Sequence, residues 1–199
     1  MDHSAGLRLN GALSIAQNKE RWQELQRQAT TAQLYNVDVR MLDKDQIKKN
    51  YPIINTDEIL GGIFMPGDGA ADPSGVTHML AKAAKKEGAQ IFEKSHVDEI
   101  LTKQGKISGV KVNGQEIECE YIVLASGMWS RQIGEKAGVS IPLYPAEHFY
   151  IITEPIKNLS KTLPTIRDFD NRTYIKEDAG KILVGIFEGN SIPAWDKTN

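Results

Sequence analysis

The chain has 199 residues, 40% of them hydrophobic and 25% charged, and a formal net charge of -2. This composition is typical of a globular protein and lacks the basic excess that favours binding to nucleic acid or anionic membranes. Cys119 is the only cysteine, which excludes an internal disulfide, and no cysteine-rich metal site or membrane-spanning segment is predicted. The single cysteine fits a reducing compartment, and the start of the chain shows no leader-like pattern. The expected location is the cytoplasm, or the mitochondrial matrix in a eukaryote.

Two helices are predicted in the first 60 residues. Residues 19–36 place Leu25 and Ala29 on a narrow apolar face with helical spacing, between glutamines and charged residues. A short second helix is predicted to begin after Asp43, a suitable N-cap, and to end before Pro52. The narrow apolar face indicates that the first helix lies on the outside of the fold.

The next segment, residues 61–94, is predicted to run as strand, loop, helix and strand. Asp72 is a suitable N-cap, the proline after it suits the first helical position, and Gly88 is expected to end the helix. A buried stripe is expected at four apolar positions of this helix: Val76, Leu80, Ala83 and Ala84.

Short strands follow, with a hairpin turn predicted at Asn113-Gly114. The segment "YIVLA", residues 121–125, is apolar at consecutive positions and is predicted to form a central strand covered on both faces. A helix is expected over 129–136, and longer strands with a hairpin at Ala179-Gly180 are expected beyond a boundary near Gly138.

The junction "EYIVLASGMWSRQIG" suggests a ligand site. Small residues between a buried strand and a helix let a ligand approach backbone N–H groups, most closely at Gly127. The alternative, that Ser126-Gly127 is only a tight turn, stays open. No G-x-G-x-x-G motif occurs in the sequence; the nearest segment, "GDGAAD", has Asp72 in place of the third glycine and is interpreted as a structural loop.

Three stretches together resemble a known family: "GGIFMPGDGAADPSGVTHMLAKAAKKEGAQIFEKSHVDEI", "ISGVKVNGQEIECEYIVLASGMWSRQIGEKAGV" and "PLYPAEHFYIITEPI". They are similar to the middle of FAD-dependent amine oxidoreductases of the D-amino-acid oxidase superfamily, and most similar to the dimethylglycine and sarcosine dehydrogenase branch. The resemblance spans roughly residues 11 to 188, and several separate motifs occur in the same order.

The resemblance implies an α/β (α+β) chain, in which a mixed-sheet substrate-binding domain accompanies a partial Rossmann-like FAD-binding domain. Residues 1–72 are expected to belong to the substrate domain with its helices. Residues 73–138 are expected to form the partial FAD-binding domain, and residues 139–199 the antiparallel sheet of the substrate domain.

The family also implies roles for particular residues. The backbone of Val97 is expected at the adenine end of FAD, and four residues are expected along the pyrophosphate and ribityl chain: Ala125, Ser126, Gly127 and Trp129. His148 and Tyr174 are expected to face the flavin and the amine, where they would keep the amine neutral and oriented for hydride transfer. The segment "HSAG" resembles the site of covalent FAD attachment, which implies a role for His3.

Each of these residues also has a structural interpretation. A histidine in an alternating strand is commonly a half-buried side chain without a catalytic role, and Tyr174 could cap a sheet edge with its hydroxyl in water. The segment "HSAG" could match by chance, because only a few residues separate it here from "GALSIAQNKERW".

The resemblance implies oxidation of an N-methylated amino acid to an iminium ion, with folate or an electron-transfer protein as further partners of the complete enzyme. The 199 residues alone are expected to be inactive, because the phosphate-binding half of the nucleotide site is missing from them. Two alternatives stay open: a stand-alone module that binds a small amine or carboxylate, and a non-catalytic regulatory relative that serves a phosphatase.

Overall fold

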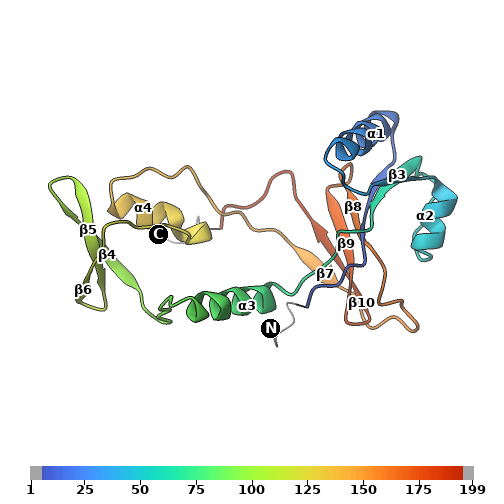
Figure 1. Ribbon diagram of the computed structural model, residues 1–199. Coiled ribbons are helices and arrows are strands. Elements are labelled where there is room, and N and C mark those ends of the chain that lie inside the picture. The colour runs from blue at the N-terminus through green and yellow to red at the C-terminus, as the bar shows by residue number, and fades with distance from the viewer. Residues whose placement is uncertain (1–5, 195–199) are drawn as a thin grey trace. The chain divides into compact units, whose positions relative to one another are not determined.

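The computed structural model describes residues 6–194, and the chain divides into two compact units. One unit contains the residues up to 83 together with 148–191, and the other contains 84–147 with the residues from 192 on. Figure 1 shows a larger sheet in the first unit and a small separate sheet in the second. No helix within residues 6–194 has the length and apolar character needed to cross a membrane.

The elements follow one another as a mixture of helices and strands, which confirms the predicted α/β class. The helices are α1 (Lys19–Leu34), α2 (Lys44–Asn50), α3 (Pro73–Lys86) and α4 (Ser130–Lys136), and a 3-10 turn, η1, covers Gly127–Trp129. The strands of the first unit are β1 (Ala12–Ala16), β2 (Arg40–Leu42), β3 (Gly61–Met65), β7 (Tyr150–Ile152), β8 (Thr165–Asp168), β9 (Thr173–Asp178) and β10 (Lys181–Ile186). The strands of the second unit are β4 (Val97–Lys103), β5 (Lys106–Val112) and β6 (Gln115–Glu118).

The first unit is built on a mixed seven-stranded sheet with the order β2-β3-β1-β8-β9-β10-β7. Strand β1 pairs in parallel with β8, and the other neighbouring strands of this sheet pair antiparallel. The parallel pair aligns Ala12 with Thr165, so it joins two segments that lie far apart in the sequence. This mixed sheet was expected, but β1, β2 and β8 were not predicted as individual strands.

The main hydrophobic core lies on one face of this sheet. Because side chains alternate between the faces of a strand, Leu13 and its register partner Ile166 point to the same side. Both are fully buried, and they belong to a cluster that also contains Ile47 of α2 and the buried Tyr51. This face is therefore filled by the core.

Helix α1 covers part of the opposite face. Its buried residues Leu25 and Ala29 pack against Ala16 of β1 and Ile63 of β3. Further along the same face, Tyr174 of β9 is half-buried and Tyr150 of β7 is 60% exposed. One half of the face is thus closed by α1, and the other half is accessible.

The caps predicted for the helices are present. Asp43 forms a capping box with Gln46 at the start of α2, and both carboxylate oxygens of Asp72 accept backbone N–H groups at the start of α3. Gly88 follows α3 with φ of +91°, a left-handed conformation that suits glycine after a helix. Local sequence therefore sets these helix boundaries.

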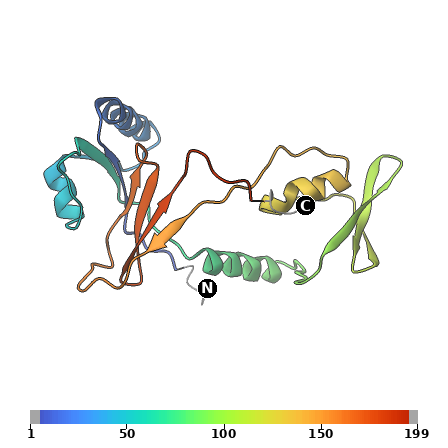
Figure 2. The same cartoon turned by 180° about the vertical axis from the view of Figure 1, so that it is seen from behind.

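The second unit contains the three-stranded antiparallel sheet β4-β5-β6. The expected turn between β5 and β6 is present, because Asn113 and Gly114 both adopt positive φ values, 50° and 80°. Figure 2, which gives the view from behind, draws residues 120–126 after β6 as a chain without strand pairing. Helix α4 follows this segment after η1, as expected for residues 129–136.

The prediction of a buried strand at 121–125 is wrong for the described structure. Tyr121 and Val123 are 85% and 89% exposed. An apolar segment becomes a central strand only where neighbouring strands supply hydrogen bonds on both sides, and none of the described strands pairs with it. The apolar sequence indicates that these side chains can be buried, but neighbouring strands are needed to bury them.

Two further predictions in this region are wrong. Residues 89–94 form no strand, and the expected stripe on α3 is not buried, since no residue of α3 is classed as buried and Leu80 is 60% exposed. A helix face is buried only by an element that packs onto it, and none of the described elements covers this one closely enough to exclude solvent.

A buried carboxylate closes the hairpin between β9 and β10. Glu177 is 2% exposed, accepts a hydrogen bond from the backbone N–H of Gly180 at 2.7 Å, and forms an ion pair with Arg8. Desolvation by burial acts to raise the pKa of Glu177, but the hydrogen bonds from Gly180 and Arg8 outweigh it, so the pKa lies below its ordinary value. This carboxylate fastens the segment around Arg8 to the sheet.

We predict that Glu177→Gln lowers the free energy of unfolding at pH 7 by about 1–3 kcal/mol, the usual effect of losing a charge-assisted hydrogen bond. Because the folded-state pKa is lowered, the carboxylate's contribution is present above the unfolded pKa and disappears as pH falls through the folded pKa. Urea unfolding at pH 7 and at successively lower pH values should therefore show the wild type and the variant converging in acid. A difference that stays constant with pH would contradict this account.

Candidate functional site

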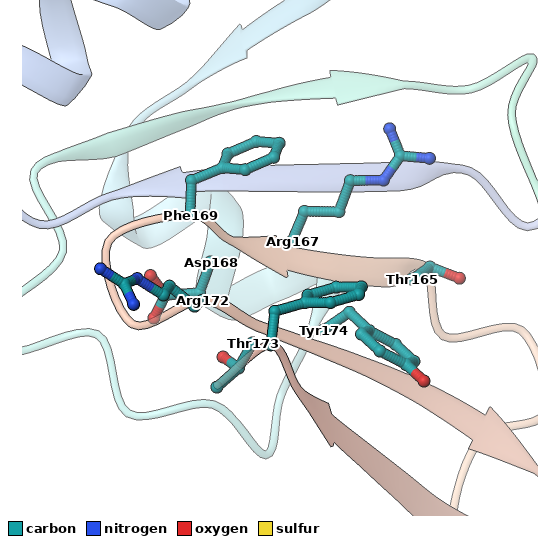
Figure 3. A pocket seen from close by; sticks show the side chains of 8 residues that line it. Thr165, Arg167, Asp168, Phe169, Arg172, Thr173 and Tyr174 are labelled. Atoms are coloured by element: carbon teal, nitrogen blue, oxygen red, sulfur yellow. The ribbon is translucent and has the colours of Figure 1, made fainter. Parts of the chain in front are cut away.

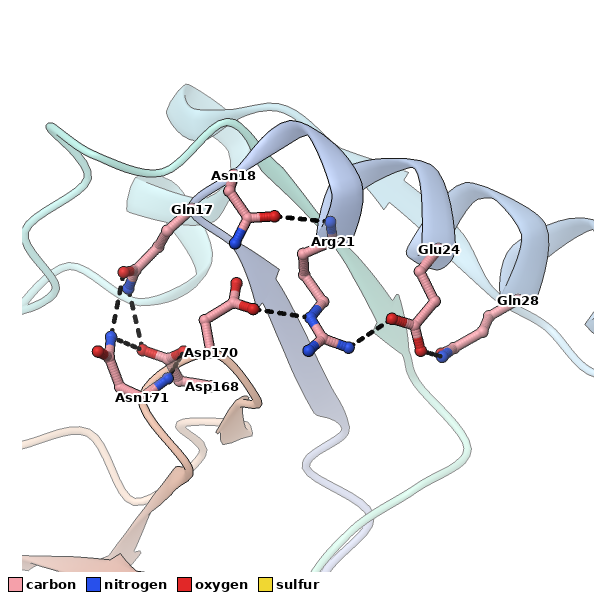
Figure 4. Close-up of polar contacts among 8 residues, drawn as sticks. All are labelled: Gln17, Asn18, Arg21, Glu24, Gln28, Asp168, Asp170 and Asn171. Atoms are coloured by element: carbon pink, nitrogen blue, oxygen red, sulfur yellow. Dashed lines mark hydrogen bonds and ion pairs between the residues drawn. The ribbon is translucent and has the colours of Figure 1, made fainter. Parts of the chain in front are cut away.

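A polar network fixes the carboxyl ends of β1 and β8 next to each other (Figure 4). Asp168, 7% exposed, accepts hydrogen bonds from Gln17 at 2.9 Å and from the side chain of Asn171 at 2.8 Å. Beside it, Arg21 of α1 donates to Asp170 at 3.0 Å. The turn between β8 and β9 is thus held to the start of α1, and this turn carries several residues of the candidate site.

A cavity of about 530 Å³ opens beside this turn (Figure 3). The residues that line it come from β8, from β9, from the turn between them and from the residue after β10: Thr165, Arg167, Asp168, Phe169, Arg172, Thr173, Tyr174 and Phe187. The lining combines aromatic rings with two guanidinium groups. Such a combination suits a small organic ligand that carries a negative charge.

The strand register places the central residues of the site in one row. Arg167 lies opposite Tyr174 in the β8–β9 pair, and Tyr174 lies opposite Gly185 in the β9–β10 pair. A Cβ atom on Gly185 would overlap the Tyr174 ring, so the absent side chain makes room for the tyrosine. The guanidinium of Arg167 donates to Asp68 at 3.1 Å.

His148 and Tyr174, the two predicted catalytic residues, both pack against one aromatic ring. The ring of Phe187 is 5.3 Å from that of His148 and 5.7 Å from that of Tyr174, measured between centroids. His148 Nδ1 lies 2.9 Å from a carboxylate oxygen of Glu188. The structure therefore brings His148 and Tyr174 into one cluster, although 25 residues of other sequence separate them.

The residues expected to contact FAD belong to the second unit. Gly127 has φ of +54° and open space where a side chain would be, and the Trp129 side chain is exposed. Ser126 is hydrogen-bonded to Ser130 across 3.2 Å, and Ala125 is exposed. The carbonyl of Val97 lies 3.4 Å from the Lys136 ammonium.

His3 lies outside the described residues. Within residues 6–194, no cluster of three or more histidine, cysteine, aspartate or glutamate side chains has the arrangement of a metal site.

Sequence reasoning missed four residues of the site: Arg167, Arg172, Phe187 and Glu188. Phe187 and Glu188 directly follow β10, and Arg167 lies on a strand that was not predicted. The sequence contains one partial signal for this site. Side chains alternate between the two faces of β9 and β10, so a hairpin turn at Ala179-Gly180 places Tyr174 opposite Gly185.

Comparisons with known proteins agree on one family. Residues 1–198 match the family described as FAD dependent oxidoreductase (DAO). The chain is 34% identical to 4-methylaminobutanoate oxidase (formaldehyde-forming) from Paenarthrobacter nicotinovorans over 92% of its length, and 32% identical to human mitochondrial sarcosine dehydrogenase over 96%. It is also 32% identical to the mitochondrial pyruvate dehydrogenase phosphatase regulatory subunit of Mus musculus over 93% of the chain.

The chain spans only part of these proteins. It covers 22% of the oxidase, 21% of the sarcosine dehydrogenase and 21% of the regulatory subunit. Among solved structures, L-proline dehydrogenase from P. horikoshii matches with a TM-score of 0.86 and 28% identity, over 96% of this chain and 51% of that one.

We predict that Gly185→Ala displaces the Tyr174 ring, because the added methyl group would occupy the position of the ring. The expected cost is about 1–3 kcal/mol of unfolding free energy, as for overpacking elsewhere. Tyrosine ring signals in an NMR spectrum should shift for Tyr174, and the double variant Gly185→Ala with Tyr174→Ala should recover part of the lost stability. Unchanged ring signals in Gly185→Ala would contradict the proposed contact.

Proposed function

The chain belongs to the DAO family of FAD-dependent oxidoreductases, and we propose that it forms the substrate-binding sheet and part of the flavin site of an enzyme that oxidises an N-methylated amino acid. The expected resemblance to the sarcosine and dimethylglycine dehydrogenase branch is confirmed. In this proposal the first unit binds the amine, and the second unit contributes to the FAD-binding domain.

The observation that carries the proposal is the cluster of His148, Phe187 and Tyr174 on the open half of the sheet. The Phe187 ring packs against the imidazole of His148 and the phenol of Tyr174, and it lines a cavity that is also lined by two arginines. An N-methylated amino acid needs these three features: an apolar surface for its methyl groups, a polar group for its nitrogen and a cation for its carboxylate.

Arg172 is the proposed partner of the substrate carboxylate. Arg167 already pairs with Asp68, whereas Arg172 makes no ion pair with any residue among 6–194. A guanidinium that is not engaged in an ion pair retains its capacity for a charge-assisted contact with a carboxylate. Its position on the turn held by Asp168 keeps it at the rim of the cavity.

His148 is the proposed acceptor of the amine's proton, and Tyr174 the group that orients the amine. An alkyl ammonium has no lone pair on nitrogen, so it must lose a proton before the adjacent C–H bond can be broken as a hydride. FAD, when bound, supplies the hydride acceptor. The residues of this chain would hold the neutral amine and direct its methyl group.

For FAD itself, the proposed contacts are those expected from the sequence: Val97, Ala125, Ser126, Gly127 and Trp129. The open space at Gly127 fits a ligand that approaches the backbone closely. The exposed apolar segment before it would gain cover from a cofactor domain. Covalent attachment at His3, and folate or an electron-transfer protein as partners of the complete enzyme, also remain proposals.

A second function is supported by one observation, the 32% identity to a phosphatase regulatory subunit. In that case the chain would bind a partner protein, and the cluster around Phe187 would have no role in oxidation. A binding experiment with a methylated amine distinguishes the oxidative function from the regulatory one. Binding of a partner protein without binding of a methylated amine would favour the regulatory function.

We predict that Arg172→Gln weakens the binding of dimethylglycine about 10- to 100-fold, corresponding to the ~1.5–3 kcal/mol of a hydrogen bond to a charged group. Binding of N,N-dimethylethylamine, which has no carboxylate, should stay unchanged. Calorimetry measures both dissociation constants, with Arg27→Gln on the exposed side of α1 as the matched control. Equal losses for the two ligands would contradict the assignment of Arg172.

We predict that the 199-residue chain binds FAD weakly, with a dissociation constant that is micromolar or higher. The sequence contains no G-x-G-x-x-G turn before a helix, and this turn contributes most of the electrostatic binding of a pyrophosphate. Titration of FAD fluorescence measures the affinity, and the visible spectrum before and after acid precipitation detects a covalent flavin. Sub-micromolar affinity would refute the prediction, and colour retained in the pellet would point to His3.

A further inference from the structure

One nitrogen atom of the His148 ring, Nδ1, lies close to two side-chain oxygen atoms. Nδ1 lies 2.9 Å from Glu188 Oε2 and 3.5 Å from Ser191 Oγ. The other carboxylate oxygen of Glu188 accepts the backbone N–H of Phe149 at 3.2 Å. Glu188 therefore connects the ring to the backbone of the following residue.

The neighbours of Nδ1 determine which nitrogen carries the proton. The hydrogen bond from His148 and those from backbone N–H groups hold the pKa of Glu188 below its ordinary value, so both oxygens act as acceptors near neutral pH. Ser191 Oγ donates its proton to the carbonyl of Glu188 at 2.9 Å, which leaves its oxygen as an acceptor toward the ring. Two acceptors thus face Nδ1, and a proton on Nδ1 satisfies both.

We propose that Glu188 is a positioning residue that holds His148 in the tautomer with the proton on Nδ1, so that the lone pair of Nε2 is free to take the proton of the substrate ammonium. This inference rests on the proposed function of His148, and it adds the residue that prepares the ring for it. Side-chain partners commonly fix the tautomer of a functional histidine in this way.

The proton transfer balances within the groups named. The N–H bond of the substrate ammonium breaks, its electron pair stays on the amine nitrogen, and the proton forms a bond with Nε2. The imidazole becomes an imidazolium, whose Nδ1–H remains hydrogen-bonded to the Glu188 carboxylate. No oxidant or other reactant takes part in this step.

The variant Glu188→Gln tests the assignment because a glutamine has a single acceptor oxygen. The backbone N–H of Phe149 can only donate, so the glutamine oxygen turns toward it and the NH₂ group faces the ring. Nδ1 must then act as an acceptor, and the proton moves to Nε2. The substitution keeps the size of the side chain, which limits effects on folding.

The tautomer is read from correlated nitrogen and proton NMR signals of the imidazole, recorded without flavin or amine at a pH where the ring is neutral. We expect a proton on Nδ1 of His148 in the wild type and on Nε2 in Glu188→Gln. Glu147→Gln, which removes the same charge one residue before the ring, should leave the tautomer unchanged. The signals of His78 and His96 serve as internal references. A wild-type proton on Nε2, or no change in Glu188→Gln, would overturn the proposal.

A binding measurement gives the functional consequence. Dimethylglycine carries an N–H that can donate to Nε2, whereas trimethylglycine has four carbon substituents on nitrogen and no N–H. We expect Glu188→Gln to weaken dimethylglycine binding at least tenfold and trimethylglycine binding less than twofold. Equal losses would show a purely structural role for Glu188 and overturn the proposal.

The two measurements separate this proposal from the proposed function. If the wild type binds neither compound, the proposal of an amine site is refuted. The role of Glu188 toward a substrate is then refuted as well, whatever tautomer the spectra show. If the wild type binds dimethylglycine and the tautomer does not change in Glu188→Gln, the amine site stands and only the positioning role is refuted.

Discussion

The parallel pairing of β1 with β8 is the contact on which the first unit depends. It joins residues near position 12 to residues near position 165, and it places the hairpin β9–β10 in the same sheet as β3. The buried carboxylate of Asp168 completes the pair by tying the end of β8 to Gln17 and Asn171. Without this pairing, Arg167 and Tyr174 would have no fixed relation to α1.

The two faces of the sheet have different roles because they are covered differently. The face that carries Leu13 and Ile166 is filled by the core and provides stability. On the other face, α1 covers only the strands around β1, and Arg167 and Tyr174 remain partly accessible, while Gly185 is buried beneath the Tyr174 ring. A rigid sheet with one covered and one open half can present a ligand site without a large rearrangement.

The second unit shows how a sequence signal depends on its surroundings. The apolar residues 121–125 resemble a central strand, yet their backbone hydrogen-bonding groups have no partner strand among the described residues. On α3, which runs from the first unit into the second, no residue is buried, and the apolar Leu80 is 60% exposed. The chain spans about half of the solved L-proline dehydrogenase, and in the proposed enzyme a cofactor domain would supply the missing neighbours.

The sequence by itself determined the family, through motifs spread over most of the chain, and the mixed α/β class. It also determined the caps at Asp43 and Asp72 and the turn at Asn113-Gly114, because each of these depends on residues close together in the chain. It also indicated His148 and Tyr174 through the resemblance to relatives. Only the tertiary structure decided that both rings pack on Phe187, because strand register brings distant residues together and local pattern does not encode register between such strands.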